Sequence, residues 1–204
     1  MPDYKREWLD KAEIDYFTPF LTLWLSCNSW YKSHYSDIQN PSDRKFINKI
    51  KTDFTPRNHL YEKFKELIEA PNRKGINFRN SLELLHYSLV RASIVPDKIK
   101  YCSFQKMLIN YSDLENELSY KNLIVTKTST KMRNNGEVRG AYIDQIFRLD
   151  EIYIIKNFED FFAGLFEIIY TVRNKLVHGS LDPKTEEHEV VKYCYFVLYD
   201  LLKN

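Results

Sequence analysis

The sequence predicts an all-α fold. In several segments the apolar residues recur at steps of three and four, the spacing that gives a helix one buried face. Aromatic residues make up 15% of the chain while only 5 glycines and 7 prolines occur among 204 residues, which argues against extended disorder. One Asn-Gly pair, Asn135-Gly136, signals a small β-hairpin, which we expect near residues 123–143.

The length of the chain favours a single domain, and its net charge does not indicate a particular kind of partner. A chain of 204 residues can build one sizeable core, so we expect a single helical domain over 1–204, with 98–155 as a less regular basic insertion. The formal net charge of +2 is too small to indicate nucleic-acid binding, because bulk charge mostly reports solubility. Any such claim depends on local clusters of charge.

The cysteines and the hydrophobic runs indicate a reducing cytoplasm. Cys27, Cys102 and Cys194 are odd in number and widely spaced, so no disulfide framework and no zinc site is expected, and the interpretation of Cys27 and Cys194 is that of buried thiols. The N-terminus has no apolar signal region, and the strongest hydrophobic run, 17–27, is too short to span a bilayer. We therefore expect a cytoplasmic location and no membrane contact.

Two helices are predicted in the first quarter of the chain. The first is expected from Thr18 to about Tyr35 with Pro19 in its first turn, although a longer helix kinked at Pro19 fits the pattern as well. After a turn, a short helix is expected from 44 to 52, with Ser42 or Asp43 as its cap.

Two further helices are predicted before the basic insertion. The third ends at Ala70-Pro71-Asn72 and is marked by Leu60, Phe64, Leu67 and Ile68. The fourth runs over 77–92 and stops at Pro96, because proline disfavours helix in the residue before it. His86 lies beside the apolar stripe of this helix and is interpreted as a hydrogen-bonded boundary histidine.

The insertion at 98–155 has a weaker pattern. Residues 104–118 could form a helix, while 126–133 and 137–143 flank the Asn-Gly turn as the two arms of the hairpin. Positive charge gathers here against one acid, Glu137. Such a segment could follow a phosphate backbone, and the candidate RNA-binding residues are Lys127, Lys131, Arg133 and Arg139. A solvated surface ribbon without nucleic-acid contact is the alternative.

The last two helices are bounded by clear signals. Asn157 is expected to cap a helix that ends before Gly179 in the left-handed conformation, and Pro183 prevents it from resuming. Its buried stripe consists of Phe158, Phe162, Leu165, Ile169, Val172 and Leu176. The final helix buries Val190, Val191, Cys194, Val197, Leu198 and Leu201. The short connection predicts that these two helices are antiparallel neighbours.

Polar residues gather in the last turns of the helix that Asn157 is expected to cap, in the run Arg173-Asn174-Lys175-Leu176-Val177-His178-Gly179. On a helical wheel Asn174 and His178 lie one turn apart and roughly opposite the buried stripe. Arg173 lies about 140° from His178 on an ideal helix, so one straight helix cannot direct both at one atom. Either the last turn distorts or a second molecule completes the group.

This run resembles the R-x4-H motif of the HEPN superfamily, small helical domains found in many metal-independent endoribonucleases. A polar residue, often Asn, follows the Arg in that family, as Asn174 does here. The resemblance covers about the last fifty residues and implies a HEPN-like helical bundle. Some toxin members carry a Tyr two residues after the His that a partner enzyme modifies; this chain has Ser180 there, which puts that regulation in doubt.

The resemblance implies RNA cleavage by attack of the ribose 2′-hydroxyl, with Arg173, Asn174 and His178 as catalytic residues and without metal or cofactor. Histidine can exchange protons at neutral pH, arginine can hold phosphate oxygens, and Asn174 can orient His178. Because the reaction needs both an acid and a base, we expect a homodimer that pairs two motifs. The implied setting is a prokaryotic toxin or phage-defence protein, with an antitoxin or defence protein as a natural partner.

Three other interpretations stay open. The chain can be a noncatalytic HEPN-like module that binds RNA or a nucleotide through the same Arg and His. It can be a helical protein-interaction domain, which predicts no RNA affinity. Finally, a helix favours cations and Asn near its C-terminal end and commonly stops at Gly, so the Arg, Asn and His can be ordinary residues of a helix end.

Overall fold

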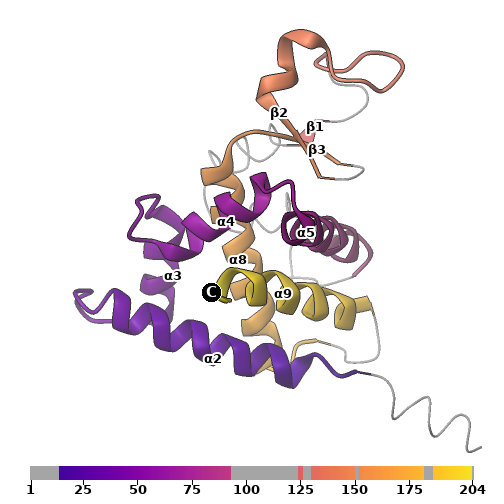
Figure 1. The fold of residues 1–204 in the computed structure, drawn as a ribbon. Coiled ribbons are helices and arrows are strands. Elements are labelled where there is room, and N and C mark those ends of the chain that lie inside the picture. Colours follow the sequence, from indigo (N-terminus) through magenta and orange to yellow (C-terminus); the bar gives the residue numbers. More distant parts are fainter. Residues whose placement is uncertain (1–13, 93–123, 126–129, 150–151, 182–185, 204) are drawn as a thin grey trace, which may run out of the picture.

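The computed structural model describes residues 14–92, 124–125, 130–149, 152–181 and 186–203. The all-α expectation is confirmed (Figure 1). The α-helices among the described residues are α2 (Phe17–His34), α3 (Asp43–Thr52), α4 (His59–Glu69), α5 (Arg73–Arg91), α8 (Phe158–Val177) and α9 (Glu186–Leu202). A small sheet and the short 3-10 helix η1 (Gly140–Gln145) lie in the 124–155 region.

Helix α8 is the centre of the core. From Phe161 to Tyr170 only Ala163 is not buried, because α3, α4, α2 and α9 all pack against this helix. In Figure 1 it runs through the body of the protein, crossing α2 and α9. A helix that is apolar nearly all round is typical of such a position.

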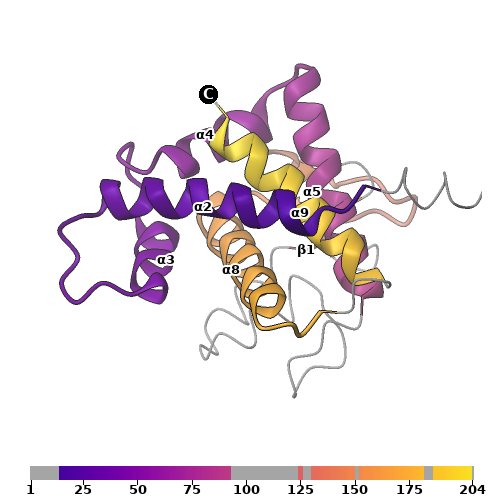
Figure 2. The same ribbon diagram turned by 90° about the horizontal axis from the view of Figure 1, so that it is seen from below.

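Helix α9 lies between α2 and α5 (Figure 1) and packs most extensively against these two helices. The six residues predicted to form its buried face are all buried. It contacts α8 as well, but in Figure 1 it crosses α8 rather than running back along it, and Figure 2 shows the same helices from below. The short connection therefore made the two helices neighbours without aligning them, because α2 and α5 provide the longer apolar surfaces for α9.

The first two helices begin within one residue of their predicted starts. Helix α2 starts at Phe17, one residue before the expected Thr18. The Ser42 side chain accepts a hydrogen bond from the backbone N–H of Lys45 and caps α3. Asn58 caps α4, and its Nδ2 donates to the carbonyl oxygens of Ile50 and Asp53 at 2.8 Å each. This buried amide therefore holds α4 against the end of α3.

Helix α5 starts at Arg73, four residues before the predicted 77. The Asn72 side chain accepts from the backbone N–H of Gly75 at 3.1 Å and caps the helix. Gly75 disfavours helix by propensity, yet it is buried where a side chain would overlap the carbonyl oxygen of Ala70. The close contact of the α4–α5 connection with this turn requires the glycine, so tertiary packing overrides propensity.

The hairpin is shorter than predicted. Met132 pairs with Val138 in a single antiparallel bridge, and the turn between them has Gly136 at φ +84°. The second predicted arm, 137–143, is wrong beyond Arg139, because η1 begins at Gly140. Its side chains have no core to cover, and Ile143 is 60% exposed. The predicted helix at 104–118 lies outside the described residues.

A three-stranded antiparallel sheet joins this region to α8. Its strands are β1 (Ile124–Val125), β2 (Ile146–Arg148) and β3 (Tyr153–Ile155), in the order β1-β3-β2. Phe147 of β2 makes an edge-on ring contact with Phe158, the first residue of α8, and Ile154 of β3 is buried. The insertion is thus anchored at the N-terminal end of α8 and projects from the helical body (Figure 1).

In the part of the chain that the structure describes, no helix is both long enough and apolar enough to cross a membrane.

Candidate functional site

The predicted motif lies where α8 leaves the core. Val172 is fully buried, Arg173 and Asn174 are partly buried, and from Val177 the chain is exposed. The core therefore covers most of the helix and leaves its final turns accessible to a ligand or to another molecule.

Arg173 is held by neighbours on two sides. Its Nη1 donates to Asn174 Oδ1 at 2.8 Å, and its Nη2 donates to Asp43 Oδ2 at 3.2 Å. The guanidinium carbon lies 5.4 Å from the centre of the Trp24 ring, and 20% of the side chain is exposed. In this conformation the charge is shared with a carboxylate and only one edge of the group reaches solvent. Contact with a phosphate would require Arg173 to turn away from Asp43.

Two buried polar atoms near Arg173 have no hydrogen-bond partner among the described residues. They are Arg173 Nε itself and the indole Nε1 of Trp24. Burial raises the pKa of Tyr31, and the nearby Asp43 carboxylate raises it further, both by its charge and as a hydrogen-bond partner of the hydroxyl. Asp43 therefore interacts with Tyr31 and with Arg173 at this corner between α2, α3 and α8.

His178 is exposed, at the C-cap of α8. Its backbone N–H donates to the carbonyl oxygen of Asn174 at 3.0 Å, so the helical pattern persists to this residue. Gly179 follows at φ +64° and donates to Leu176, and Ser180 donates to Lys175, which completes a Schellman motif. The last turn is therefore not distorted, and of the two alternatives given above the distorted turn is wrong.

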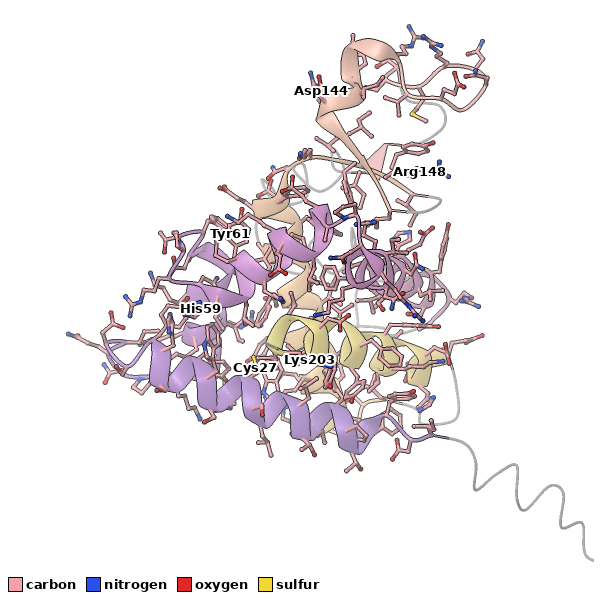
Figure 3. All side chains as sticks on the ribbon, in the orientation of Figure 1. Cys27, His59, Tyr61, Asp144, Arg148 and Lys203 are labelled. Atoms are coloured by element: carbon pink, nitrogen blue, oxygen red, sulfur yellow. The ribbon has the colours of Figure 1, made fainter. Side chains whose placement is uncertain are left out.

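The basic insertion and the motif lie at opposite ends of α8. A 20-residue helix is about 30 Å long, and the sheet contacts its first residue while His178 follows its last. In Figure 3 the side chains of Asp144 and Arg148 likewise belong to the part that projects from the helical body. One chain therefore does not bring the predicted RNA-binding residues to the predicted catalytic ones.

The described basic residues of the insertion have local contacts. Lys131 Nζ lies 5.1 Å from the centre of the Tyr142 ring, Arg133 is 3.5 Å from the Glu137 carboxylate, and Arg139 Nε donates to the Met132 carbonyl. These contacts stabilise the hairpin, and Arg133 is still 58% exposed in its side chain. Lys127 lies outside the described residues.

Sequence reasoning missed a buried ionic cluster on α8. Both carboxylate oxygens of Glu167 accept from Arg44 Nη1 at 2.8 Å, and Oε2 also accepts from Lys51 Nζ at 3.0 Å. The Arg44 guanidinium also lies 4.5 Å from the Tyr170 ring centre. A lone acid within the apolar run Phe161–Tyr170 was the available signal, but its partners are 123 and 116 positions away.

The described cysteines fit the interpretation of structural thiols. Cys27 and Cys194 are buried and form no disulfide, and burial raises the pKa of the Cys27 thiol, which keeps it protonated. Within the described ranges, no group of three or more His, Cys, Asp or Glu side chains is arranged to hold a metal ion.

Comparisons with protein-family models, with curated proteins and with solved structures found no match to this chain.

Proposed function

We propose that this protein is a metal-independent endoribonuclease of the HEPN type that acts as a homodimer. The observation that carries the proposal is the position of the R-N-K-L-V-H-G run in the last turns of helix α8, where the helix leaves the core and His178 is exposed. An ordinary helix end does not require Arg173 and Asn174 to be joined by a hydrogen bond there.

The reaction needs little from the protein because the nucleophile belongs to the substrate. A base removes the proton of the ribose 2′-hydroxyl, the oxygen attacks the adjacent phosphorus, and an acid protonates the leaving 5′-oxygen. His178 supplies the acid or the base. Arg173, once it turns from Asp43, stabilises the charge on the nonbridging oxygens, and Asn174 directs the guanidinium.

A second copy supplies what one chain lacks. Each motif has one histidine, and the regular last turn keeps Arg173 and His178 of the same chain apart. Two α8 ends related by a two-fold axis would place two histidines and two arginines in one cleft. Val177, 51% exposed beside His178, offers apolar surface for this contact.

Removal of the histidine tests the proposal. A mixed RNA pool is incubated in EDTA with wild type, His178→Ala or His59→Ala, and the cut ends are sequenced. His59 is also exposed but lies on α4, so that variant is expected to cleave like wild type. His178→Ala should lose about a hundred-fold or more in rate while it keeps its fold. A requirement for metal, or equal cleavage by all three proteins, would refute the proposal.

A noncatalytic RNA-binding module is the second candidate, and the contacts of Arg173 favour it. Because Asp43 and Asn174 already occupy both terminal nitrogens, the guanidinium can serve as a fixed part of the α3–α8 interface. In that case RNA binds in EDTA without being cut.

The setting we propose, a prokaryotic toxin or defence protein in the cytoplasm with an antitoxin or defence partner, rests on the family resemblance.

A further inference from the structure

A groove lies between α4, α5 and α9, on elements that the proposed catalytic residues do not use. It has a volume of about 730 Å³. Tyr193 and Lys203 of α9 both line it and are ten positions apart, which corresponds to roughly 15 Å along the helix. Figure 3 labels Lys203 at the C-terminal end of α9. We call this hollow the α5–α9 groove.

The wall formed by α9 is aromatic. Tyr195 and Tyr199 stack at 5.8 Å between ring centres with planes 29° apart, and Phe196 lies edge-on to Tyr195. Tyr199 is 39% exposed, so part of its side chain is accessible. Of the side chains that line the groove, four are aromatic and only two, Leu67 and Leu84, are aliphatic. A groove for an apolar helix would have the opposite balance, whereas flat rings suit flat bases.

The groove carries excess positive charge. Lys63, Lys74 and Lys203 line it against one carboxylate, Asp200. Burial raises the pKa of Asp200, while Lys203 and Lys63 act in the opposite direction, so these two cations lie close to the acid. Lys203 Nζ also lies 5.2 Å from the Tyr199 ring centre, which places a cation beside the stacking surface.

The wall formed by α5 is polar. Asn77 and Asn80 are exposed and line the groove with Ser81. Side-chain amides carry both donors and acceptors, which suits the edges of unpaired bases. Stacking rings, amides and lysines are together the chemistry of single-strand binding, in which bases stack and phosphates contact cations.

We infer that the α5–α9 groove binds a single-stranded segment of RNA, with bases on Tyr199 and Tyr195 and phosphates at Lys74 and Lys203. The inference rests on the proposed function only for the choice of RNA as the ligand. It assigns RNA contact to a surface outside the basic insertion and outside the Arg173, Asn174 and His178 group.

Binding is measured separately from cleavage with a labelled 2′-O-methyl oligonucleotide of mixed sequence, which lacks the nucleophile. Fluorescence anisotropy of the full-length protein should show binding that Tyr199→Ala weakens about ten-fold. Tyr87→Ala is the matched control, because Tyr87 lies on α5, is also 39% exposed and does not line the groove. It should bind like wild type.

The charge is tested by salt dependence. Lys74→Gln should weaken binding and reduce the slope of log affinity against log salt by about 0.7, the value for one phosphate contact with a single strand. Lys65→Gln, which removes a lysine of α4 outside the groove, should leave the slope unchanged. A duplex of the same sequence should bind more weakly, because its bases cannot stack on Tyr199.

The outcomes separate this inference from the proposed function. If wild type does not bind the oligonucleotide, if Tyr199→Ala and Lys74→Gln bind like wild type, or if the duplex binds as tightly, the groove is not an RNA site. His178→Ala is expected to bind normally. If His178→Ala does not affect cleavage, the proposed ribonuclease function is wrong. The RNA site in the groove is then still tested by Tyr199→Ala and Lys74→Gln.

Discussion

Arg173 and Glu167 are six positions apart on α8, and both pair with α3. Glu167 accepts from Arg44 and Lys51, while Arg173 donates to Asp43. In the first pair the acid lies on α8, and in the second it lies on α3. A shift of α3 along α8 would therefore bring groups of like charge together. Glu167 and Lys51 are nearly inaccessible to solvent, with 4% and 7% of their side chains exposed. Such a pair fixes register at the cost of desolvation.

Loss of the buried Glu167 carboxylate should lower the stability of the fold. Glu167→Ala removes the carboxylate that accepts from the buried Lys51 ammonium and from Arg44, so the free energy of unfolding should fall by about 3 kcal/mol, as measured by urea denaturation. Glu137→Ala, which removes an acid from an exposed pair with Arg133, should change it by less than about 0.5 kcal/mol. Equal effects of the two substitutions would show that the cluster does not hold α3 on α8.

Asp53 should make the free energy of unfolding depend on pH in the acid range. Burial opposes its ionisation, but hydrogen bonds from the Thr55 hydroxyl, the Thr55 backbone N–H and the Tyr35 hydroxyl outweigh that effect and lower its pKa below 3.8. Because folding favours the ionised form, Asp53 stabilises the protein above its ordinary pKa and loses this contribution as pH falls through the lowered value.

The corresponding measurement compares wild type with Asp53→Asn. The wild type should be more stable at about pH 7, and the difference in unfolding free energy should shrink as pH falls below the ordinary pKa of an aspartate and the carboxylate takes up a proton. A difference that stays constant over this range would mean that the charge on Asp53 contributes nothing.

At the scale of the element, the caps and apolar periods could be predicted because they are local. Ser42, Asn157 and Gly179 act as expected. Interactions between segments far apart in the sequence could not be predicted. The predicted start of α5 was misplaced because Gly75 packs against Ala70 in the preceding connection. The second hairpin arm was predicted too long, and Ile143 at its end is 60% exposed. Nor does sequence reveal that Asp43, 130 positions before Arg173, holds the predicted catalytic arginine.

Gly75 offers a test in which packing and helix propensity predict opposite signs. Propensity alone favours Ala over Gly by about 1 kcal/mol within a helix. In α5 the new methyl group would overlap the Ala70 carbonyl oxygen, so Gly75→Ala should lower the free energy of unfolding by about 1 kcal/mol or more. Gly140→Ala, with open space around it, should have little effect. Stabilisation by Gly75→Ala would contradict the close packing of α4 and α5.

At the scale of the whole molecule, α8 separates two kinds of surface. The basic insertion lies at its beginning and the Arg173, Asn174 and His178 group at its end, with the helical body around the middle (Figure 1). If RNA contacts both surfaces, as we propose, the substrate extends over the protein and the partner copy joins at the C-terminal end of α8. The small net charge of +2 is consistent with affinity that comes from local surfaces.

The dimer should depend on the tip of α8. Val177→Glu places two like charges across the proposed two-fold axis, so light scattering at several concentrations should show a shift from dimer to monomer, accompanied by loss of cleavage. Leu25→Glu, at an exposed position on α2, should remain dimeric. A wild-type protein that is monomeric at the concentration where it cleaves RNA would exclude the composite site.

The chemical identity of the cut ends tests the central claim most directly. A defined oligoribonucleotide is incubated in EDTA with the wild-type protein, and the products are identified by mass spectrometry. Attack by the 2′-hydroxyl, assisted by His178, predicts fragments that end in a 2′,3′-cyclic phosphate and begin with a 5′-hydroxyl. Fragments with a 3′-hydroxyl and a 5′-phosphate would contradict it, because water would then be the nucleophile.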